Sequence, residues 1–90
     1  MIARRFIVRG RVQGVGFRYF AIHSARRAGV VGTVRNLADG SVEAIAEGEP
    51  AAVEEFRLSL ERGPVLARVA QVVMTELPLS HRYIDFDVSF

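Results

Sequence analysis

The spacing of apolar residues along the chain changes from the period of a strand to that of a helix, and this change occurs twice. Arg5 to Val12 alternate, with Phe6 and Val8 on the same face as Val12, which predicts a half-buried strand. After a glycine-rich loop, a helical stripe follows that ends at Gly29 and consists of Phe17, Phe20, Ala21, Ser24 and Ala28. The amino-terminal part therefore predicts a strand followed by a helix.

The middle of the chain predicts a hairpin. Two segments rich in β-branched residues, Val30 to Leu37 and Ser41 to Glu47, are joined by Ala38, Asp39 and Gly40. Asp-Gly between two such segments is a strong signal for paired antiparallel strands.

A second helix is predicted from Pro50, a favoured residue of a first helical turn, to the stop at Gly63-Pro64. Its core stripe consists of Val53, Phe56 and Leu60. A strand from Val69 to Glu76 follows, and Tyr83 to Val88 alternate as a short last strand with Ile84, Phe86 and Val88 predicted to face inward.

This order, β-α-β-β-α-β with an extra strand, is the split pattern of ferredoxin-like α+β folds. We expect an antiparallel sheet with both helices on one face, and residues 1–90 as a single domain, because ninety residues supply one core. In such a fold the first two strands run in the same direction with the third between them. The loop before Phe17 and the end of the second strand at Asn36 should then lie roughly 10 Å apart, two strand spacings.

Composition narrows the function classes. The chain has no cysteine, so neither a disulfide framework nor a thiolate site is available. Its net charge is +2, but acidic residues are interleaved with basic ones, so we expect no nucleic-acid partner. The apolar run from Phe6 to Val8 is too short for a signal peptide or a membrane span. We expect a cytoplasmic monomer that does not bind membranes.

The loop between the first strand and the first helix reads Gly10-Arg-Val-Gln-Gly14-Val-Gly16-Phe-Arg18. Its glycines let successive backbone N–H groups turn inward, and the following helix adds unpaired amides and the positive end of its dipole. Arg18 adds a charged fork that matches phosphate oxygens. The loop predicts a phosphate site, although its spacing alone fits a tight turn beside a solvated arginine equally well. The predicted cradle of backbone amides comprises Gln13, Gly14, Val15, Gly16, Phe17 and Arg18.

Two other glycine motifs do not fit this loop. A Walker loop needs Lys and then Ser or Thr after its last glycine, where this chain has Phe17 and Arg18. A dinucleotide fingerprint needs a third small residue where Tyr19 stands.

Asn36 is the second candidate site residue. Asparagine is depleted in strands, and this one follows Val34 on the same face. It could merely end the strand, but the predicted topology places it at the same sheet edge as the glycine-rich loop. An amide both donates and accepts hydrogen bonds, so it can hold a water molecule against phosphorus.

The remaining polar residues suggest no other chemistry. His23 and His81 have no second ligand at metal-binding spacing, and we expect no metal and no cofactor. Asp85 and Asp87 share the outward face of the last predicted strand and are interpreted as solvated.

Three segments together resemble the acylphosphatase family: Gly10 to Arg18, Gly32 to Glu43, and Gly63-Pro64 with Ala67 and Val69. The resemblance spans essentially the whole chain. It implies a ferredoxin-like fold and a metal-free acylphosphate phosphohydrolase whose ligands are a small acyl phosphate and inorganic phosphate. It also implies that Arg18 binds the phosphate and that Asn36 orients the attacking water.

Two positions depart from the family pattern. Thr33 stands where relatives often carry an aromatic residue, and the chain ends in Ser89-Phe90 instead of Arg-Tyr. Two alternatives to an enzyme remain. One is a non-catalytic module that senses an anion or docks a partner, and the other is an RNA-binding domain, although this chain lacks the aromatic motif that such domains use.

Overall fold

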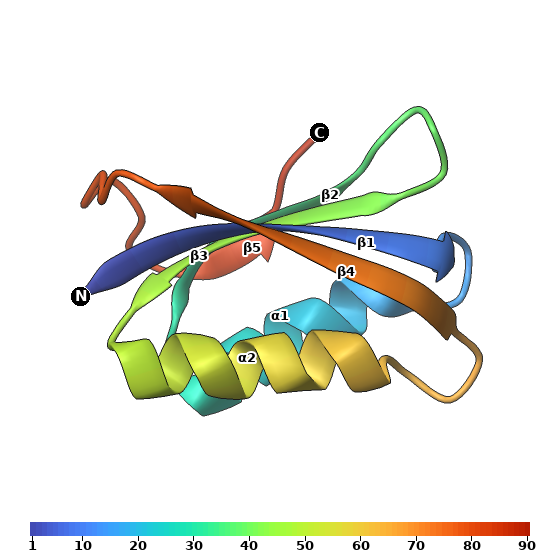
Figure 1. Ribbon diagram of the computed structural model, residues 1–90, viewed down its shortest axis with the longest axis horizontal. Coiled ribbons are helices and arrows are strands. Elements are labelled where there is room, and N and C mark those ends of the chain that lie inside the picture. Colours follow the sequence, from blue (N-terminus) through green and yellow to red (C-terminus); the bar gives the residue numbers. More distant parts are fainter.

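A computed structural model describes all 90 residues of the protein. It contains five strands and two helices: β1 (Ile2–Arg11), α1 (Phe17–Ala28), β2 (Val31–Asn36), β3 (Val42–Gly48), α2 (Pro50–Arg62), β4 (Arg68–Leu77) and β5 (Phe86–Val88). The strands form one sheet in the order β4-β1-β3-β2-β5, and both helices cover the same face of it (Figure 1). The ferredoxin-like α+β prediction is confirmed.

The helix bounds follow from local sequence. Helix α1 begins after Gly16 and ends at Gly29, whose N–H bonds back to the carbonyl of Ala25. Its last turn carries two arginines, which suit the negative end of the helix dipole. Helix α2 begins with Pro50 in the first turn and is closed by Gly63. Neither helix is long and apolar enough to cross a bilayer.

The core lies between the helices and the sheet. Its largest fully buried side chains are Phe6, Phe17, Phe56, Phe86 and Leu60. The ring of Phe56 from α2 packs edge-on against Phe6 at 6.0 Å and lies 5.3 Å from Phe86. The sheet and both helices therefore share one apolar centre.

Two expectations about the end of the chain were wrong. The last strand is only Phe86–Val88, and Ile84 is 98% exposed instead of facing inward. Alternation continues through Tyr83 and Ile84, but hydrogen bonding to β2 begins only at the carbonyl of Asp85, which accepts from the N–H of Gly32 at 3.0 Å.

The sheet is mixed, whereas the sequence predicts a fully antiparallel one. Strand β5 pairs in parallel with β2, and only the other four strands are antiparallel.

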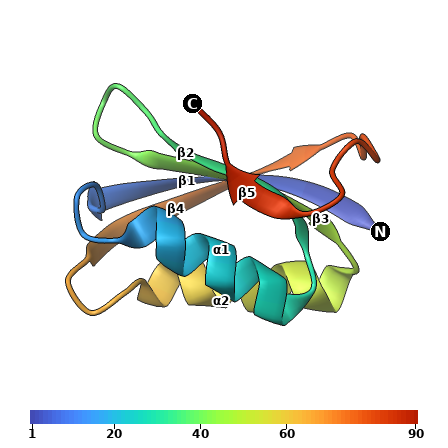
Figure 2. The same cartoon turned by 180° about the vertical axis from the view of Figure 1, so that it is seen from behind.

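The topology brings two loops together. Strand β3 lies between β1 and β2, and Val42 of β3 pairs with Val8 on one side and with Asn36 on the other. Asn36 is thus two strand spacings, roughly 10 Å, from Val8 of β1, which lies three residues before the end of that strand. Figure 1 and the reverse view in Figure 2 both show the β1–α1 loop and the β2–β3 hairpin at the same end of the molecule.

Candidate active site

The β1–α1 loop presents a row of free backbone donors. From Gln13 to Arg18, no backbone N–H donates to a protein group. Gly14 and Gly16 adopt left-handed φ angles of 75° and 80°, and a Cβ atom at either would meet nothing within 4 Å, so open space lies beside the loop. Unpaired amides at the positive end of a helix form an arrangement that binds anions.

The side chain of Gln13 ties this loop to the β2–β3 hairpin. Its Nε2 donates to the carbonyl oxygen of Leu37 at 2.8 Å and to that of Ser41 at 2.9 Å. Because Leu37 follows Asn36 directly, these bonds hold the loop against the segment that carries the asparagine. The sequence predicts only a backbone role for Gln13 and does not predict the anchoring role of its side chain. The signal was a lone amide side chain among glycines and valines.

Arg18 and Asn36 line the same hollow, of about 120 Å³, at the start of α1. The other lining residues are Val12, Gly14, Gly16, Phe17 and Tyr19. Gln13 and Val15, although part of the predicted cradle, do not line it. Sites for whole organic ligands usually have about 300–1,000 Å³. This hollow is therefore sized for a small anion such as a phosphoryl group.

The guanidinium of Arg18 forms no ion pair with a protein carboxylate. Among the arginines that form no ion pair, it alone is half-buried and the others are exposed. No carboxylate lines the hollow. The guanidinium is therefore held at the site without a protein anion to neutralise it.

Asp39 and Glu43, which lie in and next to the β2–β3 hairpin, have other partners. Hydrogen bonds from the hydroxyl and N–H of Ser41 lower the pKa of Asp39. Burial alone would raise the pKa of Glu43, but hydrogen bonds from Arg5 and Arg35 outweigh it and lower that pKa. Both stay ionised near neutral pH and are engaged away from the hollow.

The histidines also lie outside the hollow. The ring of His23 is exposed on α1 and stacks on Tyr19 at 5.9 Å. The backbone N–H of His81 donates to Glu47 at 3.2 Å. No three side chains of His, Cys, Asp or Glu lie together in a group that could hold a metal ion.

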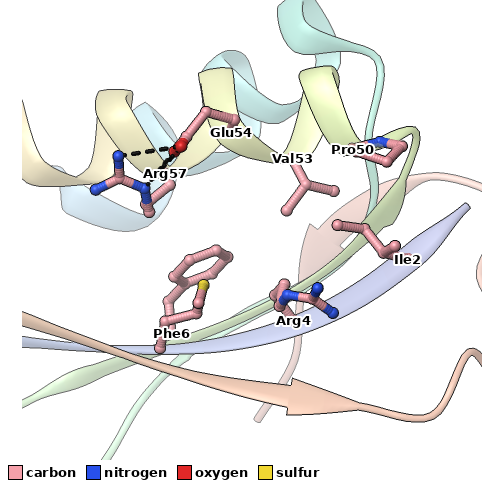
Figure 3. Close-up of a pocket in the computed structure, with 8 residues that line it drawn as sticks. Ile2, Arg4, Phe6, Pro50, Val53, Glu54 and Arg57 are labelled. Carbon is pink, nitrogen blue, oxygen red and sulfur yellow. Dashed lines mark hydrogen bonds and ion pairs between the residues drawn. The ribbon is translucent and has the colours of Figure 1, made fainter.

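A different hollow, of about 180 Å³, lies between α2 and strands β1 and β4 (Figure 3). Its charged groups are already paired: Arg57 donates to Glu54 at 3.1 Å, and Arg4 lies 3.4 Å from Glu76. Phe6 and Val53 form an apolar wall. Neither of its cations is unpaired, so it does not compete as an anion site.

Comparison with known proteins identifies the family. The acylphosphatase family model matches residues 4–88. An acylphosphatase of Pasteurella multocida is 44% identical over 90 residues, which are 100% of both chains. One of Synechococcus sp. is 54% identical over 76 residues, 84% of this chain and 76% of its own. The crystal structure of acylphosphatase from Bacillus subtilis superposes with a TM-score of 0.95 at 37% identity and covers 100% of both chains. The chain therefore belongs to the acylphosphatase family.

Proposed function

We propose that the protein hydrolyses small acyl phosphates to a carboxylate and inorganic phosphate, with Arg18 and Asn36 as its catalytic residues. The observation that carries this proposal is the meeting of free loop amides, an unpaired guanidinium and a strand-end amide at one small hollow. Family membership over residues 4–88 supports the same reaction.

In the proposed mechanism, the free amides between Gln13 and Arg18 and the guanidinium of Arg18 hold the non-bridging oxygens of the phosphoryl group. Asn36 holds a water molecule whose oxygen attacks phosphorus in line with the bond to the acyl oxygen. As that bond breaks, its electron pair leaves on the carboxylate. One proton of the water passes to a phosphoryl oxygen, and the other stays on the attacking oxygen, which becomes part of the inorganic phosphate. The same donors stabilise the charge that accumulates in the transition state.

This chemistry needs no protein acid or base. The leaving carboxylate has a conjugate acid with a pKa of about 4 to 5, so it departs without protonation. The lining of the hollow is consistent with a reaction that uses no protein acid or base, because it contains no carboxylate and no histidine. Binding, orientation and charge stabilisation remain as the contributions of the protein.

The test follows hydrolysis of benzoyl phosphate by Arg18→Ala and Asn36→Ala, together with calorimetric binding of inorganic phosphate. We expect Arg18→Ala to lose phosphate affinity and turnover together. Asn36→Ala should keep most of the affinity and lose about tenfold or more in kcat, the effect of at least one hydrogen bond. Arg27→Ala, an exposed arginine on the same helix, and Gln71→Ala, an exposed amide on β4, are the matched controls.

Near wild-type turnover by a folded Arg18→Ala or Asn36→Ala protein would refute the role of that residue. Phosphate binding without turnover of any acyl phosphate would favour the anion-sensing module instead. The expectations of a cytoplasmic monomer with no nucleic-acid partner stay predictions, which sedimentation and gel-shift measurements can check.

A further inference from the structure

A second concave region, of about 440 Å³, lies beside the hollow, between α1 and the end of the chain. Its apolar wall consists of Ile22 from α1, Val88 from β5 and Phe90. We call this region the α1–β5 groove. Figure 2 shows β5 next to α1 on this side of the molecule. The groove was not predicted from the sequence, because it depends on where β5 pairs.

The groove adjoins the phosphate hollow. Arg18 and Tyr19 line both of them. The groove then follows one face of α1, because Ile22 and Arg26 lie one and two turns beyond Arg18. A ligand with its phosphoryl group at Arg18 can therefore extend the rest of its body into the groove. Asn36 lines only the hollow, so such a ligand leaves it free to hold water.

The charges of the groove are mostly neutralised. Arg26 pairs with Asp85 at 3.0 Å. Asp87 lines the groove and forms no ion pair, and its carboxylate only accepts the neighbouring backbone N–H of Val88 at 2.8 Å. With Arg18 engaged by a phosphoryl group and Arg26 paired, Asp87 is the one side-chain carboxylate lining the groove, and it has no ion pair; the ring of His23 also lines the groove.

From the apolar wall, the shared arginine and the unpaired carboxylate, we propose that the α1–β5 groove binds the acyl part of the substrate. The groove favours uncharged apolar acyl groups, such as aryl or branched alkyl, over acyl groups with a second carboxylate. The proposal rests on the proposed function and adds a substrate class to it. An apolar acyl group covers Ile22 and Val88 and loses water-exposed surface. A second carboxylate in the groove is repelled by the like charge of Asp87.

The test compares kcat/KM for acetyl, benzoyl and succinyl phosphate at a single pH. Ile22→Ala shortens the apolar wall and should lower the benzoyl-to-acetyl ratio about three- to tenfold, less than for an enclosed pocket because the groove is open. Leu58→Ala, a leucine 51% exposed on α2, is its control and should leave the ratio unchanged.

The charge is tested separately by Asp87→Asn, which should raise the succinyl-to-benzoyl ratio about three- to tenfold at low salt and less at 0.5 M salt. Glu55→Gln, an exposed carboxylate on α2 without an ion pair, is the control and should change neither ratio. If both ratios stay at wild-type values in folded Ile22→Ala and Asp87→Asn proteins, the groove does not bind the acyl group.

Ile22 also packs against the core, so its truncation could prevent folding. A measurement on the unaltered protein covers that case: competitive inhibition of acetyl phosphate hydrolysis by phenylphosphonate and by methylphosphonate. We expect the inhibition constant of phenylphosphonate to be lower than that of methylphosphonate by about threefold or more. Equal inhibition constants would overturn the proposal. Failure to hydrolyse any of the three acyl phosphates is a different result, because it would overturn the proposed function itself.

Discussion

Replacing Gln13 tests whether the loop is positioned by its anchor to the hairpin. Gln13→Met keeps the length of the side chain but removes both hydrogen bonds, to the carbonyl of Leu37 at 2.8 Å and to that of Ser41 at 2.9 Å. Each carbonyl keeps a backbone partner: the N–H of Leu37 donates to Ser41 at 2.9 Å, and that of Gly40 donates to Leu37 at 3.2 Å. The substitution therefore leaves no acceptor without a partner.

The magnitude follows from this bonding. A neutral hydrogen bond contributes about 0.5–1.5 kcal/mol, so two contribute about 1–3 kcal/mol, and the retained backbone partners place Gln13→Met in the lower half of that range. Gln13→Glu keeps the shape but turns the donor into a carboxylate oxygen that faces two carbonyl oxygens. At pH 7 it should therefore destabilise the protein more than Gln13→Met does. The difference should shrink below about pH 4, where the new carboxyl group is protonated and can donate.

Urea unfolding measures the stability part of this prediction. For function, we expect kcat to fall about tenfold or more, because the loop can shift relative to Asn36. Phosphate affinity should change less, because the amides and Arg18 move together. Gln71→Glu on exposed β4 is the control. A Gln13→Glu protein that is as stable and as active as wild type at pH 7 would show that the anchor does not position the site.

Two further predictions concern charge and backbone conformation. Burial alone would raise the pKa of Glu43 and Glu47, but hydrogen bonds lower the pKa of both below the ordinary value of 4.5. The ionised carboxylates therefore stabilise the fold above about pH 4.5, and this stabilisation is lost as the pH falls through the lowered pKa values. Urea midpoints between pH 7 and pH 3 should fall steeply, and less steeply in Glu43→Gln than in the Glu55→Gln control; equal slopes would contradict this. Gly16→Ala introduces no clash but costs about 1–2 kcal/mol at φ 80°, so it should lower stability and phosphate affinity, whereas Gly16→Asn should cost less. Equal affinities in calorimetry would argue against a role for this loop conformation.

The helices and four of the strands could be predicted because their signals are local. Gly29 and Pro50 mark helix ends in the sequence, and Asp39-Gly40 marks the hairpin. The last strand has no such local determinant. Alternation continues from Tyr83 to Val88, but only pairing with β2 decides which of these residues form a strand and in which direction they run.

The candidate site, like the fold, could be predicted only in part from the sequence. That Arg18 and Asn36 meet at one hollow follows from strand order, which the pattern of elements predicts. The anchoring role of Gln13 joins residues 24 and 28 positions apart, and no local pattern reports such a contact. The α1–β5 groove could not be predicted either, because the position of β5 was not determined.

The separation between the loop and Asn36 is maintained from the opposite face of the sheet. Glu43 on β3 is only 5% exposed and accepts from Arg5 on β1 at 2.7 Å and from Arg35 on β2 at 2.8 Å. It therefore links the same three strands that set the spacing, one residue beyond Val42, which pairs with both Val8 and Asn36. This ion cluster, in which Glu43 is buried and both arginines stay partly exposed, contributes little net stability against an apolar replacement, because the desolvation of Glu43 offsets its Coulomb energy. Its stronger effect is on register. A slip of either neighbouring strand would separate Glu43 from an arginine and, on the other face, change the position of Asn36 relative to the β1–α1 loop.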